Sequence, residues 1–199
     1  MRQLNGRELA DYIKERQLHQ ARSLRQAHGI VPTLAIIQTK DDPVIDKYVS
    51  LKQAYGDDIF VDVQLHKIDQ ADARKTIDAL NNDSAVHGII IQLPLMETSE
   101  TEELLNSVSP EKDVDGLGVE SQWDPATPTA INWLLAGYNV DLNNKKIVIV
   151  GKGRLVGMPL LKMWTASGLN VTALDKNDTD IDRTIKNADL IVTATGVPG

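Results

Sequence analysis

The 199-residue chain contains no cysteine, only one phenylalanine and four scattered histidines. A chain without cysteine forms no disulfides and uses no thiolate as a ligand or nucleophile. The histidines show no metal-ligand spacing, so we expect no bound metal. No apolar run approaches the roughly 20 residues of a membrane-spanning helix, and residues 1–5 lack the apolar core of a signal peptide. The sequence therefore predicts a cytoplasmic protein with no membrane partner.

Basic residues are also in the minority, at 21 against 28 acidic ones, which gives a net charge of −7. The two signs are interspersed, and no basic stretch suggests binding to nucleic acid or to an anionic membrane. The chain is 42% hydrophobic and 25% charged, which is typical of a soluble globular protein. Its length allows one large domain or two small ones.

Helix and strand patterns alternate through the first hundred residues. The helix expected to begin near Leu4 has Asn5 as a candidate N-cap and Gly29 as its end, and a second helix is expected to end at Gly56. The predicted elements are helices at 4–28, 44–55, 72–80 and a short one behind a Ser99/Glu102 capping box, with strands at 34–37, 59–65 and 87–95. Because a helix lies in each crossover, we expect a parallel sheet covered on both faces.

The alternation continues after a bridging helix predicted at 127–135, with Thr127 as its N-cap and Pro128 at its first position. The elements expected next are a strand at 147–150, a helix running to 164, a strand at 170–174, a helix at 181–187 and a strand at 190–194. We therefore predict an α/β protein of two lobes. An N-terminal parallel α/β lobe would cover residues 1–125 and a Rossmann-type lobe residues 126–199.

Three glycines follow the apolar strand predicted at 147–150, in the spacing G-x-G-x-x-x-G: Gly151, Gly153 and Gly157. Glycine lets the backbone turn tightly and approach a ligand closely, and the next helix offers free N–H groups to an anion. The spacing is one residue longer than the usual dinucleotide fingerprint. Two interpretations stay open, a dinucleotide site and a plain structural turn between strand and helix.

Five side chains in the first lobe are candidates for chemistry. Tyr48 and Lys52 share one face of a predicted helix, at a spacing of four residues. A partly buried lysine beside a polar amide can act as a base, but a solvated lysine and a half-buried tyrosine would also fit. Gln92 stands at the end of an apolar strand, where it either caps backbone or points into a cleft. Asp113 and Asp115 flank one residue, so one can fix the loop while the other faces a ligand; an ordinary acidic turn would also fit.

Asp175 ends the second strand predicted in the second lobe. In dinucleotide-binding folds an acid at this point accepts hydrogen bonds from the adenosine ribose and repels a 2′-phosphate. Lys152 and Lys176 would act in the opposite direction, because either could pair with that phosphate. Ordinary loop charge is the alternative interpretation of all three.

Taken in order, these segments resemble the bifunctional methylenetetrahydrofolate dehydrogenase/methenyltetrahydrofolate cyclohydrolase family over nearly the whole chain. The resemblance rests on the motifs Tyr48-Val-x-x-Lys52, Gly88-Ile-Ile-Ile-Gln-Leu-Pro-Leu95, Lys112-Asp-Val-Asp-Gly116, Pro125-x-Thr-Pro128 and Val150-Gly-Lys-Gly-x-x-Val-Gly-x-Pro159. The Gln-Leu-Pro-Leu and Lys-Asp-Val-Asp-Gly motifs are highly specific in combination.

The resemblance implies a folate cleft between the two lobes, and it implies roles for individual residues. Lys52 would be the catalytic lysine and Gln92 the partner that tunes it. Tyr48 would pack on the aromatic ring of the folate, and Asp115, also assigned to catalysis, would hold the pterin. Leu93 and Pro94 would complete the substrate-binding set. The residues assigned to NAD or NADP are Gly151, Lys152, Gly153, Arg154, Leu155, Val156, Gly157, Asp175, Lys176, Thr195 and Gly196.

The chain departs from the family pattern at several points. Gly151-Lys-Gly153 stands where the family usually has Gly-Arg-Ser, and Asp175-Lys176 stands where it usually has His-Ser. Both differences fall where the adenosine 2′-phosphate would lie, and Asp175 favours NAD over NADP. Thr39-Lys40 replaces a Val-Gly, and the connection from 116 to 125 is short. The family also continues past Gly199 with a segment that borders the nicotinamide and folate, so the Rossmann-type lobe is incomplete relative to the family.

The resemblance predicts oxidation of 5,10-methylenetetrahydrofolate with NAD or NADP, followed by hydrolysis of the methenyl product to 10-formyltetrahydrofolate. Three alternative hypotheses stay open. The chain could be a folate- or dinucleotide-binding relative without turnover, an enzyme with only one of the two activities, or a two-lobe dehydrogenase of a small acid. The last would not need Tyr48, Lys52, Gln92 and Asp115 together. The edge strand that ends the second lobe predicts a homodimer.

Overall fold

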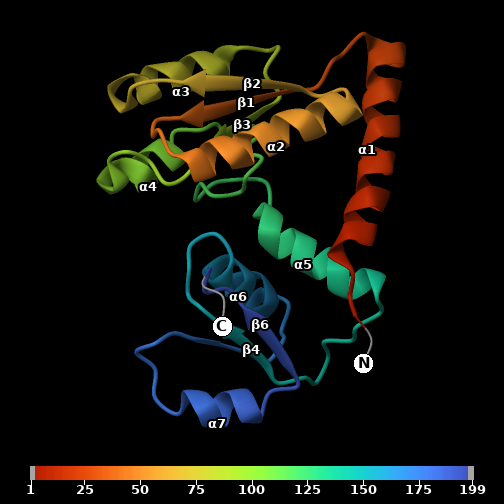
Figure 1. Cartoon of the computed structure of the whole chain (residues 1–199), viewed down its shortest axis with the longest axis vertical. Helices are drawn as coiled ribbons and strands as arrows, with labels where there is room; N and C mark the ends of the chain where they lie inside the picture. The colour runs from red at the N-terminus through yellow and green to blue at the C-terminus, as the bar shows by residue number, and fades with distance from the viewer. Residues whose placement is uncertain (1–2, 197–199) are drawn as a thin grey trace. The chain divides into compact units, whose positions relative to one another are not determined.

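The computed structural model describes residues 3–196. The chain divides into two compact units (Figure 1). The N-terminal unit holds residues 6–124, and the C-terminal unit holds residues 125–196 together with residues 3–5. Each contains a three-stranded parallel sheet, with the order β2-β1-β3 in the first and β5-β4-β6 in the second. The prediction of two parallel α/β lobes is confirmed.

The N-terminal unit alternates helices and strands in the predicted order. Its elements are α1 (Gly6–His28), β1 (Thr33–Gln38), α2 (Pro43–Ile59), β2 (Asp62–Lys67), the 3-10 turn η1 (Gln70–Asp72), α3 (Ala73–Asn82), β3 (Gly88–Ile91), the 3-10 turn η2 (Thr98–Glu100) and α4 (Thr101–Leu105). In the central strand, Leu34 pairs with Val63 of β2 and with Gly88 of β3. The loop after α4 adds a parallel bridge from Asp113 to Ile89.

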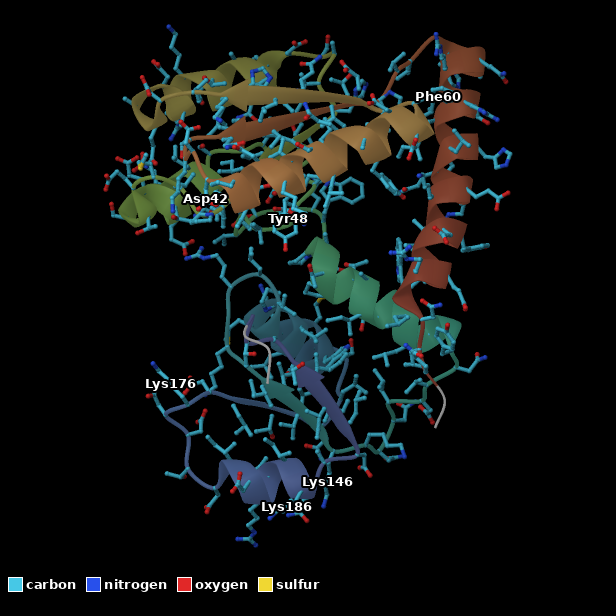
Figure 2. The ribbon with its side chains drawn as sticks, viewed as in Figure 1. Asp42, Tyr48, Phe60, Lys146, Lys176 and Lys186 are labelled. Atoms are coloured by element: carbon cyan, nitrogen blue, oxygen red, sulfur yellow. The ribbon has the colours of Figure 1, made fainter. Side chains whose placement is uncertain are left out.

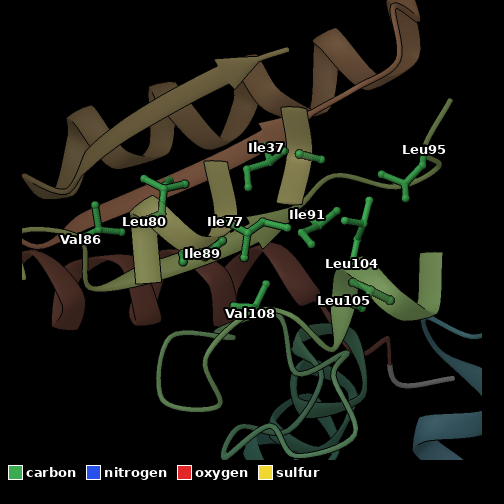
Figure 3. Close-up of a cluster of buried hydrophobic side chains, with 12 residues drawn as sticks. Ile37, Ile77, Leu80, Val86, Ile89, Ile91, Leu95, Leu104, Leu105 and Val108 are labelled. Carbon is green, nitrogen blue, oxygen red and sulfur yellow. The ribbon is translucent and has the colours of Figure 1, made fainter. Parts of the chain in front are cut away.

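Both faces of this sheet are buried because successive side chains of β1 point to opposite sides. Ile37 belongs to a cluster that α3 and α4 complete with Ile77 and Leu104 (Figure 3). On the other face Ile36 packs with Ile45 and Val49 of α2. A strand buried on both sides needs a continuous apolar run, which is the pattern that Leu34 to Ile37 shows.

The C-terminal unit contains α5 (Ala126–Gly137), β4 (Ile147–Val150), α6 (Gly157–Ala166), β5 (Val171–Leu174), α7 (Ile181–Lys186) and β6 (Leu190–Thr193). Its core lies on one face, where Ile147 and Ile149 of β4 meet Leu160 and Trp164 of α6. On the other face, beside α7, a hollow of about 350 Å³ is lined partly by Val148. This sheet is therefore packed tightly on one side only.

Several predicted boundaries are wrong. Gly56 does not end α2, which runs on to Ile59 and stops at Phe60 in the left-handed conformation, φ 61°. A Cβ on Gly56 would lie 2.4 Å from Cγ2 of Val63, so this glycine lets α2 lie against β2. The predicted strand at 59–65 consequently begins only at Asp62.

Two predicted caps are also wrong. Ser99 lies inside the 3-10 turn η2, and α4 begins after it, at Thr101. Thr127 lies inside α5, which begins at Ala126 after Pro125. The helix α5 thus begins one residue ahead of its expected cap, and α4 begins two residues after its expected cap. The strand predicted to reach Leu95 ends at Ile91, which leaves Gln92 in a loop. No helix within residues 3–196 has both the length and the apolar character needed to cross a bilayer.

Candidate active site

Helix α2 carries the first two candidate residues. Asp42 caps its start by accepting a hydrogen bond from the backbone N–H of Val44 at 2.9 Å, and Pro43 occupies the first turn. Tyr48 lies on the exposed side of α2 with 57% of its surface accessible (Figure 2). Lys52, one turn further on, is half-buried. A flat aromatic ring and an ammonium group therefore follow one another along the helix.

Lys52 reaches the loop that follows β3. Its Nζ donates a hydrogen bond to Oε1 of Gln92 at 2.9 Å. The other end of the amide is occupied, because Nε2 of Gln92 donates to the carbonyl of Leu93 at 3.0 Å. The backbone N–H of Gln92 in turn donates to the carbonyl of Ile37 at 2.8 Å, which ties the loop to β1. The carbonyl oxygen of the amide is thus fixed toward the lysine.

Leu93 and Pro94 follow in the same loop. Leu93 is partly buried against the core cluster of the N-terminal unit, whereas Pro94 is exposed. The peptide bond between them is cis.

Asp113 fixes the loop that carries Asp115. It is only 4% exposed, and its two carboxylate oxygens accept the backbone N–H groups of Gly116 at 3.1 Å and Gly118 at 2.7 Å. Upstream, the carbonyl of Lys112 accepts the N–H of Ile89 in β3 at 2.7 Å. One of the two aspartates thus anchors the loop, which leaves the other available to a ligand.

Lys112 anchors the same loop from its side chain. Its Nζ donates to three backbone carbonyls at the end of α3, those of Leu80, Asn81 and Asp83, at 2.7–2.9 Å. A cation at the C-terminus of a helix satisfies carbonyls that have no partner within the helix and opposes the negative end of its dipole. The loop is therefore attached to both β3 and α3.

Lys52 and Asp115 influence each other's protonation. Burial lowers the pKa of Lys52 below its ordinary value, and the charge of Asp115 opposes that shift in part. Burial raises the pKa of Asp115, while Lys52 lowers it and Asp113 raises it further. A lysine with a lowered pKa releases its proton more readily near neutral pH, which suits a group that exchanges protons with a substrate. The structure thus brings Lys52, Gln92 and Asp115 together, as the sequence predicts.

The glycine turn between β4 and α6 is shaped by close backbone approach. Gly151 has φ +111°, and a Cβ there would lie 2.5 Å from the carbonyl oxygen of Ala194. At Gly157 a Cβ would lie 1.9 Å from the carbonyl oxygen of Gly151. By contrast, a Cβ on Gly153 would meet nothing closer than 4.0 Å. Two glycines are therefore required by packing, and the third faces open space in which a ligand could approach the backbone.

The remaining residues predicted for the dinucleotide lie around this turn. Thr195 follows β6, and its backbone N lies 3.1 Å from the Cβ position of Gly151, so the loop holding Thr195 and Gly196 borders the turn. Arg154 and Leu155 are exposed and Val156 is half-buried. Lys176 lies on the loop after β5 with its side chain in solvent (Figure 2).

Lys152 forms ion pairs, although its position in a loop suggests a side chain that is surrounded by water alone. Its Nζ lies 2.8 Å from Oδ2 of Asp178 and 3.6 Å from Oδ2 of Asp175, and all three side chains are about one-third exposed. Sequence reasoning included Asp175 and missed Asp178. The signal that was available is the composition of residues 175–180, which are rich in aspartate and asparagine, because these side chains favour turns in which they bond nearby backbone groups.

Comparison with known proteins gives matches over nearly the whole chain. The model of the tetrahydrofolate dehydrogenase/cyclohydrolase catalytic domain matches residues 4–115, and the model of the NAD(P)-binding domain of the same family matches residues 125–199. A curated relative from Macrococcus caseolyticus, named bifunctional protein FolD, is 31% identical over 210 residues, which cover 98% of this chain and 74% of the relative.

Two solved structures show the same arrangement of elements. The FolD methylenetetrahydrofolate dehydrogenase/cyclohydrolase of Campylobacter jejuni superimposes with a TM-score of 0.92 at 31% identity, covering 97% of this chain and 73% of that one. The Trypanosoma brucei methylenetetrahydrofolate dehydrogenase-cyclohydrolase, solved with NADP and an inhibitor, gives a TM-score of 0.88 at 25% identity, with 98% and 72% covered.

Proposed function

Because the chain belongs to the tetrahydrofolate dehydrogenase/cyclohydrolase family, we propose that it is an NAD(P)-dependent enzyme of one-carbon metabolism with both activities of that family. It oxidises 5,10-methylenetetrahydrofolate to the methenyl form and hydrolyses the methenyl form to 10-formyltetrahydrofolate. The observation that carries this proposal is the half-buried Lys52 held by the amide of Gln92 at 2.9 Å, beside Asp115.

The role of Lys52 follows from its surroundings. The methenyl form of the folate is a cation, and hydrolysis adds water to it, so a proton must leave the attacking water and another must reach the nitrogen that is released. Lys52 can carry these protons because burial lowers its pKa. Gln92 holds the ammonium group in one position, which keeps it available to a single face of the substrate.

Asp115 and Tyr48 bind rather than react in this proposal. A pterin presents an N–H and an amino group side by side, and a carboxylate can accept both as a bidentate pair. Asp115 is suited to this because Asp113 has already fixed the loop through Gly116 and Gly118. The exposed ring of Tyr48 offers a flat apolar surface on which an aromatic ring of the folate can stack. Leu93 and Pro94 complete the substrate-binding set.

The turn between β4 and α6 fits a dinucleotide. Open space before Gly153 lets a pyrophosphate approach the backbone of the turn, and the positive end of the α6 dipole begins at Gly157. When bound, NAD or NADP accepts the hydride from the methylene group. The chain's contribution is to hold the dinucleotide through the turn, Asp175 and the loop at Thr195 and Gly196. Asp175 at the end of β5 supports NAD as the preferred form.

The proposal is tested with the purified chain in two assays. Formation of NADH or NADPH from methylenetetrahydrofolate reports the dehydrogenase, and loss of methenyltetrahydrofolate absorbance without any dinucleotide reports the cyclohydrolase. We expect both activities. A chain that binds folate and dinucleotide in calorimetry but turns over neither would instead be a binding relative, and activity in one assay alone would identify a single-function form.

The assembly, domain limits and location complete the proposal. We assign residues 1–125 to folate binding and catalysis and residues 126–199 to the dinucleotide. We also propose a homodimer joined through strands of the C-terminal unit, whose sheet has β5 and β6 at its edges, and action in the cytoplasm. Light scattering at high protein concentration tests the dimer, and a monomer would contradict it.

A further inference from the structure

Two turns of the C-terminal unit are joined by one lysine. Lys152 lies in the turn after β4, and Asp175 and Asp178 lie in the turn after β5. The strands β4 and β5 are neighbours in a parallel sheet, with Val150 beside Leu174, so both turns leave the same edge. In sheets of this kind the dinucleotide lies at the carboxyl edge of the strands, which is where this lysine is held.

The turn after β5 is closed by its own hydrogen bonds. Oδ2 of Asp178 accepts the backbone N–H of Asp175 at 2.6 Å, and the backbone N–H of Asp178 donates to the carbonyl of Asp175 at 3.1 Å. Oδ1 of Asp175 accepts the N–H of Asn177 at 2.8 Å. Each carboxylate is therefore oriented by the backbone. In Asp175 the other oxygen, Oδ2, faces Lys152, whereas in Asp178 the same oxygen, Oδ2, accepts both the backbone N–H of Asp175 and the ammonium group of Lys152.

Lys152 is held on one side of this pair. Oδ2 of Asp178 takes the hydrogen bond from Nζ at 2.8 Å, and the closest oxygen of Asp175 is 3.6 Å away. The pKa of Lys152 is raised, first of all by the hydrogen bond to Asp178, and the pKa of Asp178 is lowered by the same bond. Lys176, one residue after Asp175, is exposed and forms no ion pair within residues 3–196.

The charges of this cluster bear on the 2′ position of the adenosine ribose. One ammonium group and two carboxylates sum to −1, and a 2′-phosphate adds close to two further negative charges. Of the two lysines that could pair with that phosphate, Lys176 has its side chain in solvent, and Lys152 already donates its hydrogen bond to Asp178. A 2′-hydroxyl needs no cation and can donate to a carboxylate such as Asp175. The arrangement therefore suits the hydroxyl and opposes the phosphate.

We propose that Asp178 is a positioning residue that sets cofactor specificity: it engages the ammonium group of Lys152 in a hydrogen bond, so that this group is not available to an adenosine 2′-phosphate, and thereby makes the site prefer NAD to NADP. The inference rests on the dinucleotide site of the proposed function. This inference differs from a role for Asp175 alone. It implies that Lys152 could bind a 2′-phosphate once a substitution at Asp178 removes its ion pair. A merely structural link between two turns would leave the ligand preference unchanged.

The test uses two adenosine fragments that differ in the 2′-phosphate, 5′-AMP and 2′,5′-ADP, with calorimetry on the full chain. Asp178→Asn removes the charge but keeps an oxygen that can accept the N–H of Asp175, so the turn is retained. We expect Asp178→Asn to shift the ratio of the two affinities by about tenfold toward 2′,5′-ADP, because one repulsive charge is lost and Lys152 is left with a neutral amide oxygen in place of a carboxylate, so a phosphate can compete for it. NADP relative to NAD should shift in the same direction.

Three controls separate positioning from general charge. Asp182→Asn removes an exposed aspartate of α7 in the same unit and should change the ratio less than about twofold, since it is screened by solvent. Asp178→Glu keeps the charge and should keep the wild-type ratio. The double variant Lys152→Met/Asp178→Asn should lose the gain, because the freed ammonium group supplies most of it.

The inference is overturned if Asp178→Asn leaves the ratio unchanged, if Asp182→Asn shifts it equally, or if wild type binds neither fragment. Failure of the proposed function looks different. A wild type that binds both fragments and responds to Asp178→Asn as expected, yet turns over no folate, would leave the role of Asp178 standing and reject the enzymatic activity.

Discussion

The two units share one sheet topology but bury it to different extents. In the N-terminal unit the central strand β1 has Ala35, Ile36 and Ile37 fully buried, and helices pack on both faces. In the C-terminal unit β4 is buried as well, but its buried apolar contacts form a single cluster, with α6 on one face. The same order of elements therefore produces one sheet with two cores and one with a single core.

The candidate groups are held differently in the two units. In the N-terminal unit, side chains are fixed by other side chains and by buried carboxylates, as Lys52 is by Gln92 and as the loop is by Asp113. In the C-terminal unit, the candidate dinucleotide site consists of the backbone of a glycine turn. Ion pairs of partly exposed side chains lie beside this turn. Proton transfer needs a positioned side chain, whereas a pyrophosphate is bound well by backbone N–H groups.

The largest effect is expected from a substitution in the N-terminal unit, where the candidate site is formed by side chains. Lys52→Met keeps a long apolar side chain at this position of α2 but removes the proton carrier. We expect cyclohydrolase turnover to fall by about 10²- to 10⁴-fold, the usual contribution of a general acid or base, with dinucleotide affinity unchanged. The matched control is Lys47→Met, because Lys47 is an exposed lysine of the same helix. Wild-type turnover in a folded Lys52→Met variant would reject the role of this lysine.

A smaller effect is expected from breaking the backbone site. In Gly157→Ala the new methyl group would lie 1.9 Å from the carbonyl oxygen of Gly151. The turn would have to move, and we expect a loss of about 3 kcal/mol in the free energy of unfolding, measured by urea denaturation. Gly153→Ala is the matched variant, since its methyl group meets nothing closer than 4.0 Å. It should remain stable but bind NAD and NADP more weakly. Equal stability losses in the two variants would contradict the distinction between packing and binding glycines.

Asp115→Asn tests whether the two units bind their ligands independently, because it should weaken the binding of folate and leave the binding of the dinucleotide unchanged. The substitution replaces one acceptor of the bidentate pair with a donor. We expect folate affinity to fall about tenfold or more, the range for a hydrogen bond to a charged group, while NAD affinity stays the same. Asp124→Asn, at an exposed aspartate, serves as the control. Calorimetry that gave equal folate affinities for wild type and Asp115→Asn would count against pterin binding by this carboxylate.

The smallest effect concerns stability and pH. The pKa of Asp115 is raised above its ordinary value of 3.8 by burial, so the folded state favours the protonated acid. The protonated carboxyl therefore contributes fully to the stability of the folded state when the pH is below the pKa of Asp115 in the unfolded chain. This contribution is lost as the pH rises through the pKa of Asp115 in the folded state. Asp115→Asn stays neutral, so we expect it to have a slightly higher Tm than wild type at pH 7. This advantage should shrink as the pH falls toward 4. A Tm difference that grew on acidification would mean that the sign is wrong.

The sequence predicted the order of elements better than their limits. Strand β4 matches its prediction residue for residue, because Ile147 to Val150 is an apolar run with a glycine at its end. Helix α2 was predicted to stop at Gly56, since glycine usually ends helices, but tertiary contact with Val63 is what requires glycine there. Local pattern cannot report a contact with a residue on another element.

The same limit applies to the site. Lys52 and Gln92 could be proposed from their motifs, yet which end of the amide faces the lysine depends on the carbonyl of Leu93. Asp113 and Asp115 are alike in sequence, and only the positions of Gly116 and Gly118 show which of them anchors the loop. The sequence alone did not reveal the ion pair of Lys152, because its partner Asp178 lies on a different turn of the chain.

The attachment of the 112–118 loop has a consequence for hydrogen exchange. The carbonyl of Lys112 holds β3, its ammonium group holds the end of α3, and Asp113 holds the amides of Gly116 and Gly118. Because the carboxylate that accepts these two amides is only 4% exposed and its loop is tied to a buried strand and a core helix, we expect the amides to exchange slowly with deuterium. Binding loops usually belong to the least protected parts of a protein. Here the loop that carries Asp115 should open only when the sheet beneath it unfolds, so it is protected together with the core.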